Sequence, residues 1–388
     1  MNCFEIRADT HDPPARGRAR PALGRPPGYA EASRASSRVS RLTWRRASVW
    51  AAWLALAGLG GAAALDHRPA VGAEVAGGLH VEVVATGIPR PIQLAFDARG
   101  GLVVLSHGWR GDAAGEIYRV DLDAPLPVDM ARAPRVVIPF ADGPRKAALG
   151  SLAIDVSSGD LFLGEENGNR IYRLGADQRL QAVAVGLNHL LGGSALSLDR
   201  QGRLVFLDYA SMETHLRSET PLPPSLSWLI DEGYQGPLVF RIDPREERPL
   251  PRCADLLTPI LPRGGANPVG QELVWRLIGV APVQDDLVLL SVVGEVFRLG
   301  SDGELRLITR LPGGHYHRTN VTTGPDGSVF VCGGFQIRQI FRISPSGSVS
   351  IVASELGDPG GIVVDGAGAL YVAETALHRI IRISAGGR

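Results

Sequence analysis

One short strand motif recurs six times along the 388-residue chain and constrains the fold more than any other feature. Each copy reads aliphatic, then aromatic or aliphatic, then Arg, then aliphatic. The central arginines follow one another at intervals of 54, 68, 57, 44 and 40 residues: Arg119, Arg173, Arg241, Arg298, Arg342 and Arg382. Recurrence of one unit over the length of a chain predicts a repeat architecture, in which each unit packs against its neighbours.

Each copy is the third strand of a larger unit. An apolar run that follows a Gly or Asp turn precedes every copy, and another short strand precedes that run. A more polar fourth strand follows most copies, as at 304–308 and 348–352. Four short strands in a unit of roughly 40 residues are typical of a β-propeller blade, whereas helices would show a 3.6-residue period. The apolar runs lie at 102–105, 161–163, 204–207, 287–290, 329–331 and 370–372.

The two ends of the repeated region are complementary. The last copy reaches the end of the sequence without a fourth strand, while residues 80–84, ahead of the first unit, alternate as an edge strand should. Strand exchange between the ends would remove both free edges, which is how propellers avoid edge-to-edge aggregation. We therefore predict an all-β fold at 79–388: a six-bladed β-propeller with four-stranded blades, closed by the N-terminal strand joining the last blade.

The last repeat carries a family resemblance. Its sequence at 357–383, GDPGGIVVDGAGALYVAETALHRIIRI, resembles an NHL repeat and is similar to blades of the NHL and gluconolactonase/strictosidine-synthase-like superfamily of six-bladed propellers. That superfamily includes calcium- or zinc-dependent lactonases, amidating lyases and propellers without activity. The resemblance therefore implies the fold more closely than the chemistry.

The zero net charge of the chain is a sum over two unlike parts. Residues 1–64 hold ten Arg and four acidic residues, a net of 10 − 4 = +6, so the remainder carries 30 − 36 = −6. The acidic balance of the propeller region argues against nucleic acid as a partner. Residues 1–48, rich in Arg, Pro, Ala and Ser, are expected to form a disordered basic leader.

Residues 49–65 form a 17-residue uncharged run that ends in small residues. This pattern predicts the core of a signal peptide cleaved near Ala64, and export to the periplasm or the medium. The alternative is a retained membrane anchor, in which case this segment alone contacts the membrane. The basic region is long for a signal peptide, so we also expect synthesis to begin at Val39 and not at Met1. We expect a monomer. Export would permit a disulfide between Cys253 and Cys332, although unpaired core cysteines are the commoner outcome.

Carboxylates are expected at one mouth of the propeller. The second strand of each blade ends beside the loop that leads into the first strand, so six second-strand ends share one face: Ser106, Glu165, Asp208, Ser291, Gly333 and Glu374. Carboxylate and amide oxygens suit Ca²⁺, and Zn²⁺ is the other candidate cation. The predicted metal ligands are Glu165, Asn167, Asp208 and Glu374. The alternative is that Glu374 and Glu165 brace their blades by pairing with Arg379 and Arg170, whereas Asp208 has no matching Arg.

Histidines and arginines are expected on the same rim. The segment 315–318, His-Tyr-His-Arg, precedes the fifth blade, and His107 follows the second strand of the first. The candidate catalytic residues are His315, His317, Arg318 and His107, as a zinc set or an acid/base pair. Arg90 and Gln93 would reach the mouth from the first blade. The insertion at 210–235 would hang over it as a lid, or would pack on a neighbouring blade.

Three functions remain open. The first is a metal-dependent lactone or ester hydrolase, although lactonases of the superfamily carry Glu at the start of the first blade, where this chain has Arg90-Pro91-Ile92-Gln93. The second is a non-catalytic propeller that binds a small molecule, a glycan or a protein. The third is a quinone-dependent dehydrogenase, because His315 and Arg318 are similar to the His-x-x-Arg stretch of sorbosone-type sugar dehydrogenases. No phosphate-binding loop, serine-esterase elbow or zincin motif is present.

Overall fold

The computed structural model describes residues 73–108, 115–138, 148–165, 170–185, 187, 195–209, 237–246, 277–313, 316, 319–334 and 336–386. The chain divides into two units, Met1–His67 and Arg68–Arg388, and every described residue belongs to the second. The predicted leader at 1–48, the apolar run at 49–65 and the insertion at 210–235 lie outside the described residues. Among the residues that are described, no helix is long and apolar enough to cross a membrane.

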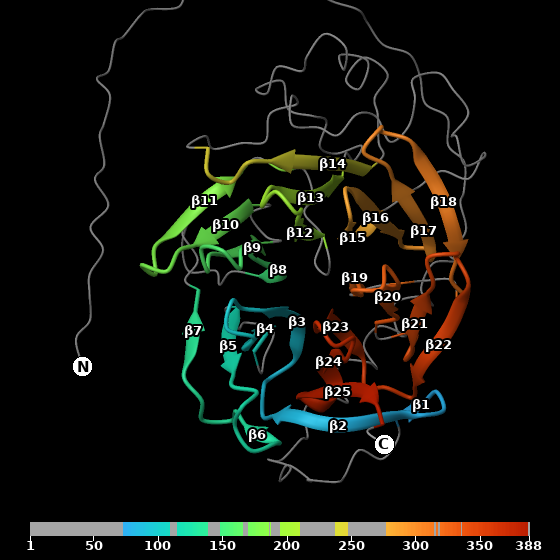
Figure 1. Ribbon diagram of the computed structural model, residues 1–388. Helices are drawn as coiled ribbons and strands as arrows, with labels where there is room; N and C mark the ends of the chain where they lie inside the picture. Colours follow the sequence, from blue (N-terminus) through green and yellow to red (C-terminus); the bar gives the residue numbers. More distant parts are fainter. Residues whose placement is uncertain are drawn as a thin grey trace, which may run out of the picture. The chain divides into compact units, whose positions relative to one another are not determined.

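Six small sheets surround a common axis, as Figure 1 shows. The fold is all-β, a six-bladed propeller, as the repeats predicted. Blades 1 to 3 are β3 (Pro91–Phe96), β4 (Leu102–Ser106), β5 (Glu116–Val120) and β7 (Arg135–Val137); β8 (Leu149–Ile154), β9 (Leu161–Glu165), β10 (Arg170–Leu174) and β11 (Leu180–Ala184); and β12 (Leu196–Leu198), β13 (Leu204–Tyr209) and β14 (Pro237–Ile242).

Blade 4 is β15 (Leu277–Val283), β16 (Asp286–Ser291), β17 (Glu295–Leu299) and β18 (Leu305–Arg310), and blade 5 is β19 (Val321–Thr323), β20 (Val329–Cys332), β21 (Ile340–Ile343) and β22 (Val349–Ser354). Blade 6 is β23 (Pro359–Val364), β24 (Leu370–Glu374) and β25 (Arg379–Ala385), completed by β2 (Leu79–Thr86). All six predicted motif strands and the runs before them are strands. Blade 3 has three strands within its described residues, and the other blades have four or five.

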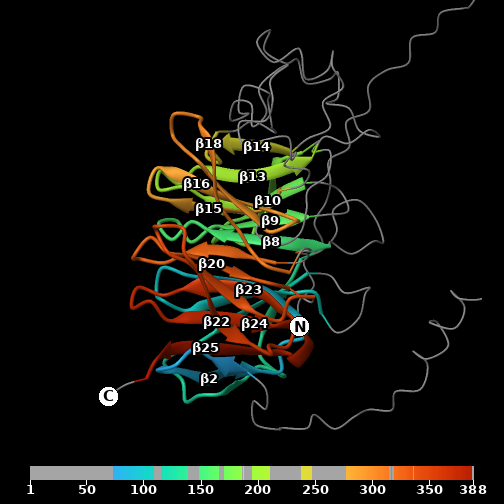
Figure 2. The same ribbon diagram turned by 90° about the vertical axis from the view of Figure 1, so that its right-hand side faces the viewer.

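The N-terminal strand β2 closes the ring by pairing with the last blade, as predicted. Two short strands that were not predicted also take part. Strand β2 pairs antiparallel with β25, so that Val83 lies opposite Ile381. Two further strands extend this closure: β1 (Glu74–Val75) pairs with the outer strand of blade 5, and β6 (Val128–Asp129), from the connection after β5, pairs in parallel with β2. The N-terminal segment therefore joins blades 5 and 6, while a segment of blade 1 joins blade 6. Figure 2 shows β2 beside β25 from a second direction.

The core lies between the blades, because each sheet is apolar on both faces. In β5, Ile117 packs with Leu161 of blade 2, while the next residue, Tyr118, packs with Val84 and Ile380 of blade 6. Alternate residues of a strand face opposite sides, so a strand buried on both faces reads as a continuous apolar run. This explains why the motif is aliphatic or aromatic at all positions but one.

The exceptional position, the motif arginine, is explained by an ion pair. Five of the six pair with an aspartate at or beside the turn between the first and second strands of their own blade, and the sixth pairs with the closing strand β2. The N···O distances are 3.3 Å for Arg119–Asp97, 2.7 Å for Arg173–Asp160, 3.3 Å for Arg241–Asp199, 2.6 Å for Arg298–Asp286, 2.8 Å for Arg342–Asp326 and 2.5 Å for Arg382–Glu82. The motif arginines thus brace the face opposite the predicted mouth.

Candidate functional site

The second-strand ends share one face of the ring, as predicted. In the strand register Ser106 lies opposite Pro91, Glu165 opposite Leu149, and Glu374 opposite Pro359. Each of these partners begins the innermost strand of its blade. Ser106, Glu165, Asp208, Ser291 and Glu374 are all buried. The mouth of the propeller is therefore ringed by polar side chains held close to the backbone of the inner strands.

Glu374 takes part in a buried brace. Its Oε2 accepts a hydrogen bond from Arg379 Nε at 2.5 Å, and its Oε1 accepts one from the backbone N–H of Gly357 at 2.7 Å. The exposed fractions of the two charged side chains are 1% for Glu374 and 11% for Arg379. Both carboxylate oxygens thus have partners inside blade 6, which is the bracing arrangement that the sequence offered as the alternative to metal binding.

Glu165 and Asp208 differ in the residue that lies opposite each of them on the neighbouring strand. Arg170 lies opposite Glu165, in the same relation as Arg379 to Glu374, so blade 2 repeats the charge pattern of blade 6. Leu238 lies opposite Asp208 instead. Asp208 is therefore the predicted ligand whose cross-strand position holds no arginine, as the sequence indicated.

The predicted metal site is only partly within the described residues. Glu165, Asp208 and Glu374 are described, while Asn167 lies outside. No group of three or more His, Cys, Asp or Glu side chains that could hold a metal ion occurs among the described residues. With Glu374 engaged by Arg379, the described carboxylates by themselves do not fit a complete Ca²⁺ or Zn²⁺ site, and cation binding stays a prediction that rests on Asp208.

The predicted catalytic residues His315, His317 and Arg318 lie outside the described residues, as does the lid at 210–235. Tyr316, between the two histidines, is described. Its ring is fully buried, its backbone N–H donates to Val292 O at 2.7 Å, and its hydroxyl donates to Pro312 O at 2.5 Å. Tyr316 therefore packs between blades 4 and 5.

A histidine that sequence reasoning missed lies beside the predicted rim residues. His378 Nδ1 accepts a hydrogen bond from the backbone N–H of Arg90 at 3.0 Å, and Arg90 O accepts one from the N–H of His107 at 3.2 Å. Burial, followed by the charge of Arg90, lowers the pKa of His378 below its ordinary value. Arg90 and His378 both adopt positive φ angles, 42° and 54°, which non-glycine residues seldom do. His378 is thus held as a neutral imidazole whose Nδ1 is an acceptor.

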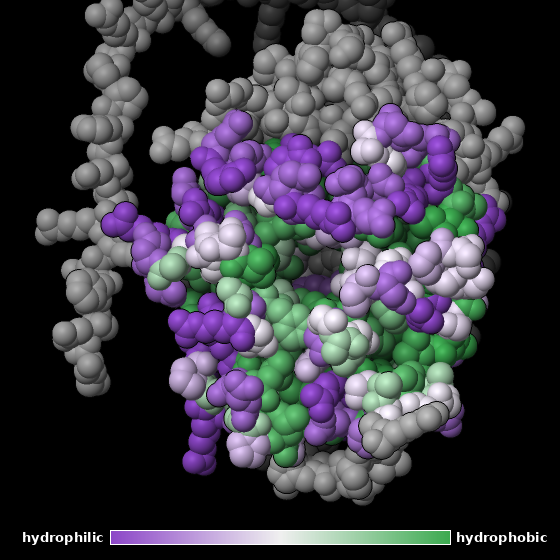
Figure 3. All heavy atoms as spheres, viewed as in Figure 1, coloured by the Kyte–Doolittle hydropathy of each residue, from purple (hydrophilic) through white to green (hydrophobic). Residues whose placement is uncertain are grey.

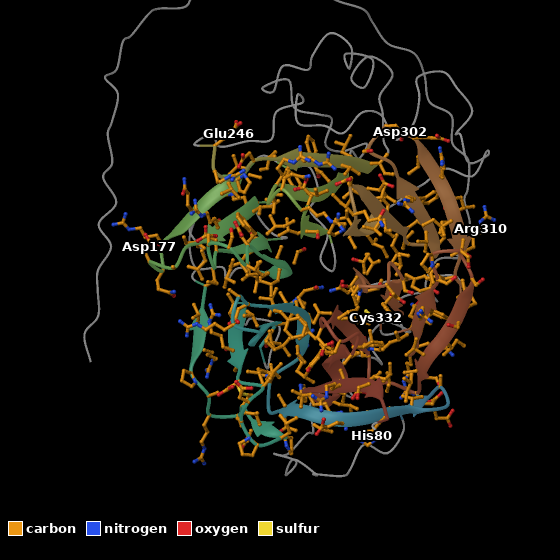
Figure 4. The ribbon with its side chains drawn as sticks, viewed as in Figure 1. His80, Asp177, Glu246, Asp302, Arg310 and Cys332 are labelled. Carbon is orange, nitrogen blue, oxygen red and sulfur yellow. The ribbon has the colours of Figure 1, made fainter. Side chains whose placement is uncertain are left out.

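An amide pair links two blades that are not neighbours. Asn320 Nδ2, at the start of blade 5, donates a hydrogen bond to Gln93 Oε1 of β3 in blade 1, with blade 6 between them. Asn320 is also held by Cys332, whose Sγ accepts from the Asn320 N–H at 3.0 Å and donates to Gly360 O at 3.2 Å. Cys332 is a free, buried thiol, as expected for an unpaired core cysteine. In Figure 4 it lies toward the axis of the ring, whereas Arg310 lies at the periphery.

A cavity of about 260 Å³ runs along the axis, lined by residues from the innermost strands of all six blades. Gln93 and Asn320 line it, together with the hydroxyl-bearing side chains Ser197 and Thr322. Aliphatic residues make up most of the remainder, among them Leu152, Val280 and Ile362. On the face seen in Figure 3, apolar residues surround a hollow at the centre of the ring. The described lining includes no charged side chain.

His378 and Asn320 could have been found only in part from the sequence. The turn that contains His378 follows Glu374 by four residues, so its position at the mouth was predictable, but the hydrogen bond to Arg90 joins residues 288 positions apart. The bond between Gln93 and Asn320 spans 227 positions. Neither pairing has a local sequence signal, because both depend on how the ring closes.

The fold and the mouth define the class: a six-bladed β-propeller with a polar mouth. No protein-family model matches the chain, and no curated protein matches its sequence. Among solved structures, a gluconolactonase from Xanthomonas campestris is similar, with a TM-score of 0.51, 16% identity, and 82% of this chain and 99% of that chain covered. An oxidoreductase from Thermus thermophilus, named as a candidate glucose dehydrogenase, is similar with a TM-score of 0.50, 18% identity, and 79% and 100% covered. The expected likeness to gluconolactonase-type propellers is thus confirmed at the level of the fold.

Proposed function

We propose that the chain is a hydrolase of small uncharged lactones or esters, with its site at the mouth of the propeller. The observation that carries the proposal is Asp208, a buried carboxylate at the end of the second strand of blade 3, with Leu238 opposite it on the neighbouring strand. A buried carboxylate at the mouth of a propeller is a candidate general base or cation ligand.

The names of the similar structures support the substrate class. One is a gluconolactonase and the other is named as a candidate glucose dehydrogenase, so both concern glucose or its oxidised lactone. The axial cavity fits a molecule of this kind. The hydroxyl groups of Ser197 and Thr322 and the amide groups of Gln93 and Asn320 offer both donors and acceptors to an uncharged polyhydroxylated ligand. We therefore place sugar-derived lactones first among the substrates to test.

A divalent cation, Ca²⁺ or Zn²⁺, remains part of the proposal, with Asp208 as its central ligand. A cation at the mouth would polarise the carbonyl group of a bound lactone. Glu374 is not included, because both of its oxygens serve the brace. Export is also proposed, on the strength of the apolar run at 49–65, and sequencing of the mature N-terminus tests it.

The test is hydrolysis of gluconolactone and δ-valerolactone by the purified propeller, with and without added Ca²⁺ or Zn²⁺. Asp208→Asn should lower kcat/KM by roughly 100-fold or more, in the range seen for loss of a general base. Asp286→Asn is the matched control, because Asp286 braces Arg298 on the opposite face. Lactone binding without turnover would make the chain a non-catalytic binder. Equal cation affinity in wild type and Asp208→Asn would remove Asp208 from the cation site.

A further inference from the structure

Gln93 holds donors that the fold does not use. Its side chain is 3% exposed and lines the axial cavity. Its single described hydrogen bond is made by Oε1, which accepts from Asn320. The Nε2 group carries two N–H donors, and neither has a partner within the part of the chain that the structure describes. Gln93 lines the cavity, so these donors are available to an acceptor that enters it.

The position of Gln93 is fixed from two sides. On one side, Gly361 of blade 6 lies so close that a Cβ atom at this position would stand 2.8 Å from Ile92 O and 3.0 Å from Gln93 Cα. On the other side, the hydrogen bond from Asn320 fixes the orientation of the amide plane, and Cys332 in turn fixes Asn320. The Nε2 donors are therefore held in one orientation before any ligand binds, which reduces the entropy lost on binding.

The lining of the cavity indicates the chemistry of the missing acceptor. No charged side chain is among the described residues that line it, so a charged ligand would lose hydration without gaining an opposite charge. The hydroxyl groups of Ser197 and Thr322 line the same cavity and can act as donors or acceptors. A volume of about 260 Å³ is slightly below the usual range for small-molecule pockets, which favours a compact ligand.

We infer that Gln93 Nε2 binds the carbonyl oxygen of the ligand, and that Gln93 thereby selects uncharged carbonyl compounds such as lactones, esters and lactams. This inference rests on the proposed function for the identity of the ligand. It goes beyond that proposal in naming the residue that recognises the carbonyl group. Asn320 is a positioning residue in this arrangement, because it holds the amide of Gln93 through the other end of the hydrogen bond.

The experiment measures binding of δ-valerolactam, which the enzyme should not hydrolyse, by NMR titration at pH 8. Gln93→Glu keeps the shape and the acceptor for Asn320 but lacks the Nε2 donors, so the Kd should rise about tenfold, as expected for one lost hydrogen bond. Gln93→Met, which has similar length and no N–H group, should give a similar loss. Asn320→Ala leaves the donors in place and should raise the Kd by less than about threefold.

The outcomes separate this inference from the proposed function. Unchanged lactam binding in Gln93→Glu and Gln93→Met overturns the inference, as does an equal loss in Asn320→Ala, because Gln93 would then act only through the bridge. Wild-type protein that binds the lactam but does not hydrolyse δ-valerolactone contradicts the hydrolase proposal alone, and the variants still decide the role of Gln93. Wild-type protein that hydrolyses δ-valerolactone but binds no lactam overturns the inference alone.

Discussion

Arg382, in the last strand of the propeller, donates a hydrogen bond at 2.5 Å to Glu82 in the strand that closes the ring, although 300 positions separate the two residues. In blades 1 to 5 the equivalent arginine pairs with an aspartate of its own blade. The closing strand therefore supplies the sixth blade with the acidic partner that the other blades provide for themselves.

The ion pair should nevertheless contribute less to closure than the apolar contacts beside it. The side chains of Arg382 and Glu82 are 37% and 35% exposed, and pairs of this kind are worth up to about 1 kcal/mol. Ile381 is fully buried, and truncation of such a residue costs about 2–5 kcal/mol. In urea unfolding, Glu82→Ala should lower the free energy of unfolding by less than Ile381→Ala does. The reverse order would mean that charge, and not burial, closes the ring.

The buried ion pair between Glu374 and Arg379 should contribute more to stability than the exposed pair between Glu82 and Arg382. Glu374→Ala would leave Arg379 buried without its partner, and breaking such a pair costs about 3–5 kcal/mol. The double variant Glu374→Ala/Arg379→Ala should lose less free energy of unfolding than the sum of the two single variants, because no unpaired charge is left buried. Glu304→Ala, which removes an exposed partner of Arg306, is the control and should change stability little. Additive losses would argue against a brace.

Cys332 should be unreactive while the protein is folded. Complete burial raises the pKa of its thiol to about 12, so the nucleophilic thiolate is scarce at pH 8. Iodoacetamide labelling followed by trypsin digestion isolates this cysteine in the peptide 319–338. We expect almost no label on that peptide in native protein and full label in guanidinium chloride. Rapid native labelling would show that blades 5 and 6 separate readily at the mouth.

His378 should make stability depend on pH. Its pKa is lowered in the folded state, mainly by burial and further by Arg90, so the unfolded chain binds the proton more tightly. The stability due to neutral His378 is fully present above about pH 6.5, the ordinary value, and is lost as pH falls from there to the folded-state pKa. His378→Gln should unfold with a weaker pH dependence between pH 7 and 5. An unchanged pH profile would contradict the assignment.

The fold was predictable because the signals for it are local. The motif around each arginine, the turns and the unpaired strand at 80–84 all lie within a few residues of one another, and they determined blade number and closure. The extra strands β1 and β6 were missed because two-residue strands such as 74–75 carry no period. The role of the motif arginines was also missed, because their aspartate partners lie 12 to 42 positions away, at a turn that only the folded blade brings near.

The site was predictable only in outline. Counting strands placed Glu165, Asp208 and Glu374 on one face, and a nearby arginine in the sequence correctly suggested the brace of Glu374. The contacts that shape the mouth join different blades, as Gln93 does with Asn320 and Arg90 does with His378. Such pairs depend on the angle between blades and on the distance across the axis. The pattern of strands in the sequence determines neither quantity.

Gly361 should be indispensable for bringing blade 1 against blade 6. A Cβ atom there would meet Ile92 O at 2.8 Å and Gln93 Cα at 3.0 Å, and both are too close for ordinary contact with the main chain. Gly361→Ala should therefore lower the free energy of unfolding by about 1–3 kcal/mol, the usual cost of overpacking. It should also disturb the hydrogen bond between Gln93 and Asn320. Gly366→Ala is the matched control, because nothing lies within 4 Å of its Cβ position and its φ is not positive. Equal stability of the two variants by urea unfolding would show that the inner strands move apart at no cost.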